Sequence, residues 1–177
     1  MVRRRVAPLR RPVGDDRGAA AVEFALLFPL FLIVVFGIIN FGFAFNQKIN
    51  LTQAAREASR FGATLSLKAS AANNTGTVDT WLAKVRDVAV SAGGADLAAS
   101  RPGRYVCVAY VTAAQTKSLT VGTGGPAASQ RCYNDNRTDD RVQVVLRSDT
   151  AIDLPLVPAP NVIGSESVTR FEATVPS

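Results

Sequence analysis

The chain has 177 residues, a formal net charge of +6, 47% hydrophobic residues and no histidine. Without histidine, serine–histidine and cysteine–histidine nucleophilic sites and histidine-ligated metals are excluded. Phosphate-binding and dinucleotide-binding glycine motifs and a C-x-x-C pair are also missing from the sequence. We therefore expect a protein that is not an enzyme and that binds neither a cofactor nor a metal.

The positive charge is concentrated in the first 18 residues. Six arginines and two aspartates give this leader a net charge of +4, out of +6 for the whole chain. A basic segment directly before an apolar one is typical of membrane orientation signals. The positive charge therefore indicates the orientation of the chain in a membrane. Because it is explained in this way, we expect no nucleic-acid partner.

The segment from Phe24 to Phe45 contains 22 residues without a charge. As a helix it would be roughly 33 Å long, enough to cross a hydrocarbon core of about 30 Å. It is longer than the apolar region of a cleaved secretory signal, about 7–15 residues, and no A-x-A site follows before Lys48. The positive-inside rule then predicts a single-pass protein of the cytoplasmic (inner) membrane, with its N-terminus in the cytoplasm and its C-terminal domain outside.

The helix is expected to continue beyond the membrane, so that residues 19–67 form one transmembrane helix with an extracytoplasmic extension. Apolar residues recur at helical spacing on one face of the extension: Leu51, Ala54, Ala55, Ala58, Phe61 and Leu65. This face must be buried, either on the protein's own head or between subunits.

A second helix is predicted over Val78–Ala92. Thr77 is available as its N-cap and Gly93-Gly94 would end it. Trp81 lies near the apolar face of this helix, and we expect it in a core.

The residues after Tyr105 have the composition of strands. Tyr105–Ala113 and Arg141–Arg147 are rich in valine and tyrosine, Ser167–Val175 is a third candidate, and Lys117–Val121 is a weaker fourth. Residues 68–177 are therefore expected to form an extracytoplasmic α+β head with a second helix and a three- to four-stranded antiparallel sheet.

Cys107 and Cys132 are the only cysteines. In an extracytoplasmic domain an even number of cysteines favours a disulfide, and free buried thiols are the alternative. A bridge across this loop would stabilise the head by roughly 3–4 kcal/mol through the entropy of the unfolded chain.

An acidic run from Asn134 to Asp140 follows the second cysteine. It lacks the glycine at the sixth position and the glutamate at the twelfth that a calcium-binding EF-hand loop requires. We expect a solvated turn there. The spacing of Asp139, Asp140 and Asp149 also gives no support to a membrane-tethered enzyme with paired carboxylates.

The stretch Gly18-Ala19-Ala20-Ala21-Val22-Glu23-Phe24 places a small residue five positions before an acid, at the start of the apolar helix. This arrangement resembles the class III signal of type IV prepilins. Residues 17–63 more specifically resemble TadE/TadG-like proteins, which are pilin-like components of the tight-adherence (Tad, Flp-type) pilus system. The similarity includes Gly37-Ile38-Ile39-Asn40-Phe41-Gly42 and Ala54-Ala55-Arg56-Glu57-Ala58.

The resemblance implies cleavage by a prepilin peptidase after Gly18, which would leave Ala19 as the mature N-terminus. It also implies an assembly role for Glu23 and Phe24, with the Glu23 carboxylate pairing with a new α-amine. The implied partners are the peptidase, other pilins or pseudopilins, the Tad assembly machinery and membrane lipid. The head is too large for a major Flp pilin, so the expectation is a minor pilin or pseudopilin that supports pilus assembly or adhesion and can enter a surface pilus. The alternative is an unprocessed, signal-anchored extracytoplasmic binding or structural protein.

Overall fold

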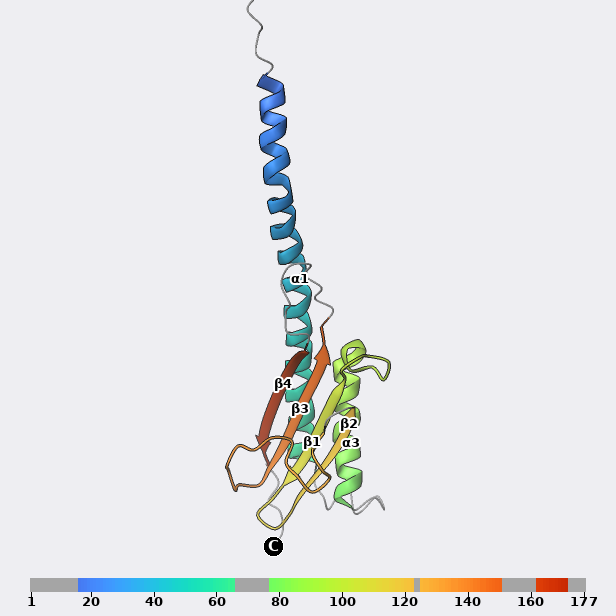
Figure 1. Ribbon diagram of the computed structural model, residues 1–177. Helices are drawn as coiled ribbons and strands as arrows, with labels where there is room; N and C mark the ends of the chain where they lie inside the picture. The colour runs from blue at the N-terminus through green and yellow to red at the C-terminus, as the bar shows by residue number, and fades with distance from the viewer. Residues whose placement is uncertain (1–15, 66–76, 123–124, 151–161, 172–177) are drawn as a thin grey trace, which may run out of the picture. The chain divides into compact units, whose positions relative to one another are not determined.

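The structure is a computed structural model that describes residues 16–65, 77–122, 125–150 and 162–171. Among these residues, the helices α1 and α3 come first along the chain and an antiparallel sheet follows (Figure 1), which confirms the predicted α+β class. In chain order the elements are α1 (Asp16–Thr64), α3 (Val78–Gly93), the 3-10 turn η1 (Gly94–Leu97), β1 (Tyr105–Val111), β2 (Thr116–Gly122), β3 (Arg141–Asp149) and β4 (Val162–Arg170).

The chain divides between Ile39 and Asn40 into two compact units. The first holds the beginning of α1. The second holds the remainder of α1 and every other element, and is called the head below. The two units are described separately.

The head contains a four-stranded sheet in the order β2-β1-β3-β4, with every neighbouring pair antiparallel. In the central strand β1, Val108 lies opposite Leu119 of β2 and Val144 of β3. All seven residues of β1 are buried. A strand covered on both faces needs no polar alternation, which explains its uninterrupted apolar sequence.

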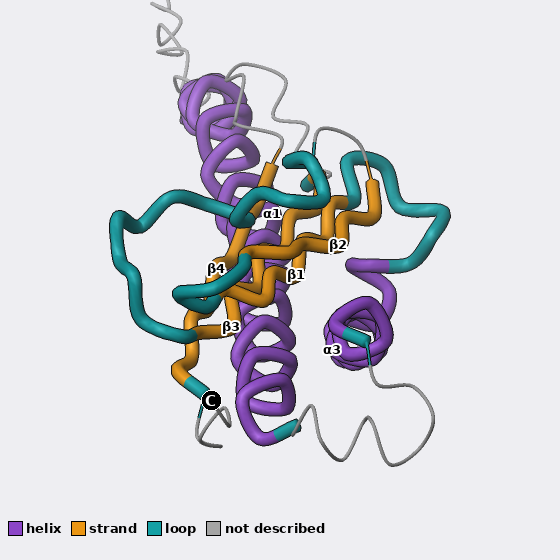
Figure 2. Tube along the Cα trace, turned by 90° about the horizontal axis from the view of Figure 1, so that it is seen from below, coloured by secondary structure: helices purple, strands orange, loops and turns teal. Residues whose placement is uncertain are grey.

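One face of the sheet is covered by α3 and by the part of α1 that belongs to the head; Figure 2 shows both helices on the same side of the strands. Leu51, Ala54, Ala55 and Ala58 of α1 are buried in this core, as their spacing predicts. Phe61, predicted on the same face, is 37% exposed. Its place in the core is taken by Gly62, because α3 approaches the helix too closely there for a large side chain.

Trp81 is fully buried at the centre of this core, which confirms the prediction made from its position on α3. Its ring makes an edge contact with Tyr110, with centroids 5.3 Å apart, and lies 5.9 Å from Phe171. The Trp81 indole also donates a hydrogen bond to the carbonyl of Leu65, the residue that follows α1. One tryptophan therefore joins α1, α3, β1 and the residue that follows β4.

The predicted bounds of α3 are nearly those observed, and Gly94, with φ of +51°, ends the helix as expected. Thr77 occupies the N-cap position, but its side chain makes no capping hydrogen bond. Its hydroxyl instead lies 3.3 Å from that of Thr80.

The predicted strand Ser167–Val175 is wrong in its bounds. The strand begins five residues earlier, at Val162, and ends at Arg170; residues 172–175 lie outside the described part of the chain. The hydrophobic pattern does not predict the bounds of this strand, because β4 contacts α1 through hydroxyl groups. Ser59 hydroxyl lies 2.8 Å from that of Ser167 and accepts a hydrogen bond from Thr169 at 2.9 Å.

We predict that Gly62→Val will destabilise the head by about 1–3 kcal/mol, the usual cost of overpacking a filled core. A Cβ atom at Gly62 would lie 3.0 Å from the Trp81 ring and 3.1 Å from Val85. Because Trp81 is the only tryptophan, urea unfolding of the detergent-solubilised full chain can be followed by its fluorescence.

Arg60→Val is the matched control, since Arg60 is an exposed position of the same helix. It also places a valine in α1, but on the exposed side of the helix and outside the core. Equal stabilities of the two variants would contradict the close packing inferred at Gly62.

Candidate functional site

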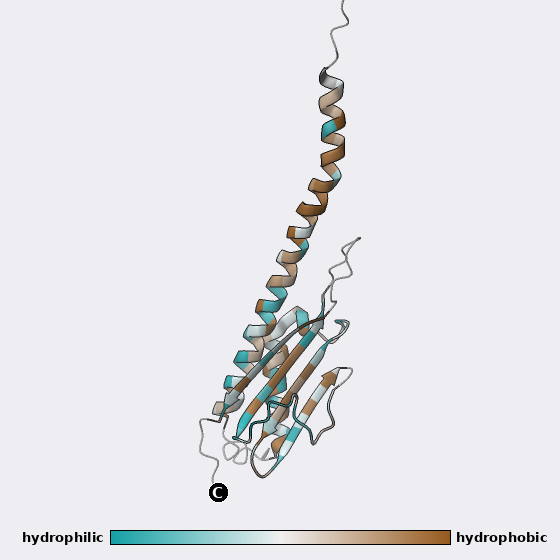
Figure 3. Ribbon diagram, turned by 60° about the vertical axis from the view of Figure 1, so that its left-hand side comes forward, coloured by the Kyte–Doolittle hydropathy of each residue, from teal (hydrophilic) through white to brown (hydrophobic). Residues whose placement is uncertain are grey.

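The N-terminal half of α1 is the candidate site. Within the described residues, one helix, over Gly18–Thr64, is long and apolar enough to cross a membrane. Its large apolar side chains are exposed, for example Phe24 at 66% and Phe41 at 71%. Figure 3 shows the nearly continuous hydrophobic colouring of this segment and the mixed colouring of the helix in the head. Such a surface requires lipid or other apolar helices around it.

Gly18, Ala19, Glu23 and Phe24 all lie in α1 and are all exposed. Nothing lies within 4 Å of the position that a Cβ atom of Gly18 would take. Glu23 forms no hydrogen bond or ion pair with any residue that the structure describes. The ring of Phe24 lies 5.4 Å from that of Phe28, one turn later.

Such a carboxylate is unfavourable at the edge of an apolar helix unless a cation pairs with it. The structure places Glu23 where a partner from another chain could reach it.

Pro29 lies inside α1 without ending it. Proline has no N–H, so the carbonyl of Ala25 loses its usual intrahelical donor. In a membrane, neighbouring helices or side chains commonly satisfy such a freed carbonyl. The apolar segment therefore carries a second polar group, besides the Glu23 carboxylate, that an adjacent helix could satisfy.

Two of the carboxylates considered for catalysis, Asp139 and Asp140, make structural contacts. Asp139 binds the guanidinium of Arg141 and lies 2.9 Å from Nε of Arg170. Asp140 accepts a hydrogen bond from the backbone N–H of Ala113. The described residues contain no group of three or more cysteine or acidic side chains that could hold a metal ion.

The acidic run after Cys132 is irregular and largely exposed, and it also contacts a buried arginine. Arg141, at the start of β3, is fully buried, and its guanidinium binds the carboxylates of both Asp135 and Asp139. Two carboxylates thus neutralise one buried cation and fold the loop over the sheet. The run is therefore solvent-accessible as predicted, and its contact with a buried arginine is a feature that the prediction did not include.

Ionisation of the two acids reflects this arrangement. Desolvation opposes charge on Asp135, but the backbone N–H of Arg137 and the Arg141 guanidinium outweigh it and lower the pKa of Asp135. Desolvation likewise opposes charge on Asp139, but hydrogen bonding to its own backbone and the cations Arg141 and Arg170 lower the pKa of Asp139. Both acids are therefore charged at neutral pH.

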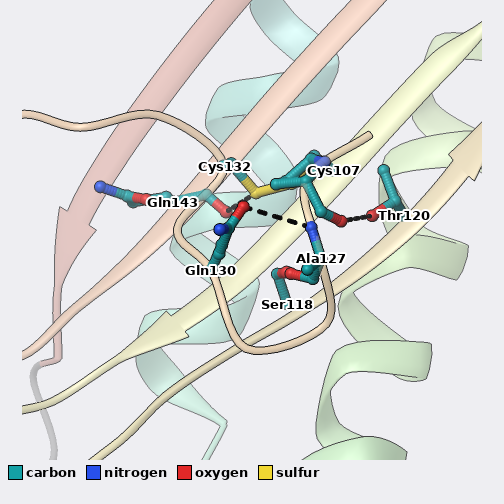
Figure 4. The surroundings of a disulfide bond; sticks show 8 residues. Cys107, Ser118, Thr120, Ala127, Gln130, Cys132 and Gln143 are labelled. Carbon is teal, nitrogen blue, oxygen red and sulfur yellow. Dashed lines mark hydrogen bonds between the residues drawn. A yellow bond between two sulfur atoms is a disulfide. The ribbon is translucent and has the colours of Figure 1, made fainter. Parts of the chain in front are cut away.

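Cys107 and Cys132 form a disulfide with an S–S distance of 2.03 Å, as predicted. Cys107 lies on the face of β1 turned away from the helices, and Cys132 lies in the loop that crosses this face (Figure 4). Nearby, the backbone N–H of Ser118 donates to the carbonyl of Ala128. The disulfide and this hydrogen bond hold the loop on the second face of the sheet.

Together these features define a class: a protein with one N-terminal helix suited to a membrane span and an α+β head closed by a disulfide. A protein-family model described as TadE-like protein matches residues 18–60, which lie entirely within α1 and begin at Gly18. The match covers about a quarter of the chain and confirms the predicted resemblance in this segment. No curated protein and no solved structure matches the chain.

We predict that Asp135→Asn will lower the stability of the head at pH 7 by about 2 kcal/mol, since a buried guanidinium loses a charged hydrogen-bond partner. The lowered pKa of Asp135 means that its carboxylate stabilises the fold above its ordinary pKa of 3.8, and that this contribution is lost as the pH falls through the folded-state value. Stability of the wild type should therefore decrease below about pH 4, and less steeply in the variant. Urea unfolding between pH 2.5 and 7 measures both effects.

Asp87→Asn provides the control, because its ion pair with Arg86 is exposed. Its stability should stay within about 0.5 kcal/mol of wild type. Parallel pH profiles for wild type and Asp135→Asn would show that Asp135 does not contribute to acid sensitivity.

Proposed function

We propose that this protein is a component of a tight-adherence pilus system, acting as a minor pilin or pseudopilin whose role is assembly and not catalysis. The carrying observation is the TadE-like match over residues 18–60, on a helix whose large apolar residues are exposed. A membrane-anchored component with this surface can associate laterally with the apolar helices of other pilins.

In this proposal the helix is inserted in the cytoplasmic membrane with its basic leader in the cytoplasm and its head outside. The arginines at positions 3, 4, 5, 10, 11 and 17 support this orientation. The disulfide also supports an extracytoplasmic head, since such bonds persist in oxidising compartments.

A prepilin peptidase would cut the chain between Gly18 and Ala19. The exposed position of Gly18 and the open space around it suit access by a protease. The new ammonium group of Ala19 would then pair with Glu23 of the same chain or of a neighbour. That pairing would offset the cost of the carboxylate in an apolar environment and fix the axial register between neighbouring helices.

The head would be displayed from this anchor, either along the fibre or at its start. It is far larger than the matched segment and has a core and a disulfide of its own. Such a domain suits an accessory subunit that supports assembly or adhesion.

Gly18→Val is predicted to block removal of residues 1–18. The substitution would place a branched side chain immediately before the scissile bond, where the wild type has none. Intact-protein mass spectrometry of the membrane-extracted chain, with and without a co-expressed prepilin peptidase, measures cleavage directly. Gly37→Val is the matched control, as Gly37 also has open space around it but lies far from the bond. A wild-type chain that keeps its leader in cells making the pilus would overturn the proposal in favour of an unprocessed, signal-anchored extracytoplasmic protein.

Glu23→Gln is expected to leave cleavage intact but to reduce co-purification with other pilus subunits at least about tenfold, as loss of one charged pair in an apolar setting implies. The substitution keeps size and polarity and removes only the charge. Glu57→Gln makes the same change at an exposed position of α1 within the head and should have no effect. Equal recovery of subunits with both variants would argue against a role for the Glu23 charge.

A further inference from the structure

A cavity of about 370 Å³ lies in the head beside α1, where the uncharged segment ends. Its volume falls within the range of small-ligand sites, about 300–1,000 Å³. Asn40, Phe43 and Ala44 of α1 line one part of it, and these residues belong to the uncharged segment. Phe43 is 71% exposed and gives this part an apolar surface.

The other part of the cavity is polar and contains two opposite charges. Arg101, in the turn before β1, and Asp96, in η1, both line it. They are not paired with each other among the ion pairs of the described residues. Arg101 makes one long hydrogen bond, 3.4 Å from its Nη2 to the carbonyl of Asp149, and Asp96 accepts one of 3.4 Å from Asn50. Both charged groups keep most of their hydrogen-bonding capacity for a ligand.

Thr150 supplies an independent indication of a ligand. Its side chain lines the same cavity and it is only 8% exposed. Its hydroxyl has no hydrogen-bond partner in the part of the chain that the structure describes. Buried hydroxyls are normally paired, so this one points to a group that binds in the cavity.

We propose that this cavity binds the headgroup of a zwitterionic aminophospholipid, with the phosphate on Arg101 and the Thr150 hydroxyl and the ammonium on Asp96. A separated cation and anion match a headgroup that carries both charges, whereas Asp96 would repel a purely anionic one. Phe43 belongs to the uncharged segment predicted to enter the membrane, so its exposed ring would contact the acyl chains of a bound lipid. The inference rests on the membrane anchoring included in the proposed function.

The test is native mass spectrometry of the detergent-solubilised full chain with equimolar dioctanoyl phosphatidylethanolamine and dioctanoyl phosphatidylglycerol. We expect the ethanolamine lipid to bind at least about fivefold more tightly, and Arg101→Gln to weaken binding of both lipids about tenfold or more. Asp96→Asn should remove the preference for ethanolamine and retain binding of the glycerol lipid. Lys48→Gln is the matched control, because Lys48 is a cation of α1 that lines a different cavity, and it should change neither affinity.

Equal binding of both lipids by the wild type, or an unchanged preference in Asp96→Asn, would overturn the proposal. Inorganic phosphate or phosphoethanolamine that binds as tightly as the lipid would identify a soluble ligand instead. If Trp81 fluorescence shows that Arg101→Gln does not fold, the selectivity of Asp96→Asn decides, since an unfolded protein would lose both lipids together. Failure here would leave leader cleavage and subunit co-purification unaffected, so it is distinguishable from failure of the proposed function.

Discussion

A stripe of small residues on α1 is the feature on which the head depends. Ala54, Ala55, Ala58 and Gly62 allow the sheet and α3 to approach the helix closely, and Trp81 fills the space that Gly62 leaves open. Small residues at such a contact bury little area themselves, but they bring larger groups of the partner elements together. The same helix exposes large side chains in its N-terminal half, where the requirement is contact with lipid or with other helices.

The sequence predicts those helices and strands whose apolar residues follow one regular pattern. Helical spacing from Leu51 to Ala58 and the apolar run of β1 were sufficient to predict the helices and the central strand. The N-terminal motif, with Gly18 five positions before Glu23, was sufficient for the family resemblance. The cysteine pair was predictable because no other cysteine could compete.

The features that sequence reasoning missed are those in which polar groups are buried. The predicted bounds of β4 were shifted toward the C-terminus. Ser165, Ser167 and Thr169 of this strand face α1 and pair with its hydroxyls, a contact that a hydrophobic pattern does not reveal. Arg141 was predicted only as the first residue of a strand, and nothing in the sequence indicated that it is buried under Asp135 and Asp139. The available signal was an arginine within six residues of several acids, which is too common to indicate burial. The cavity at Arg101 and Thr150 could not be foreseen either, because its lining residues come from segments far apart in the sequence.

The hydrogen bonds between α1 and β4 have a mechanical consequence. Lys48 binds the carbonyl of Gly164, Thr52 pairs with Ser165, and Ser59 pairs with Ser167 and Thr169, so the two elements run in the same direction. A force along the axis of α1 would act parallel to β4 and load these contacts in shear. All of them would bear the force at the same time, and none would break before the others. Force applied along the anchor would thereby be transmitted to β4 and on to β3 through their continuous ladder. This geometry suits a domain that bears load through its N-terminal helix.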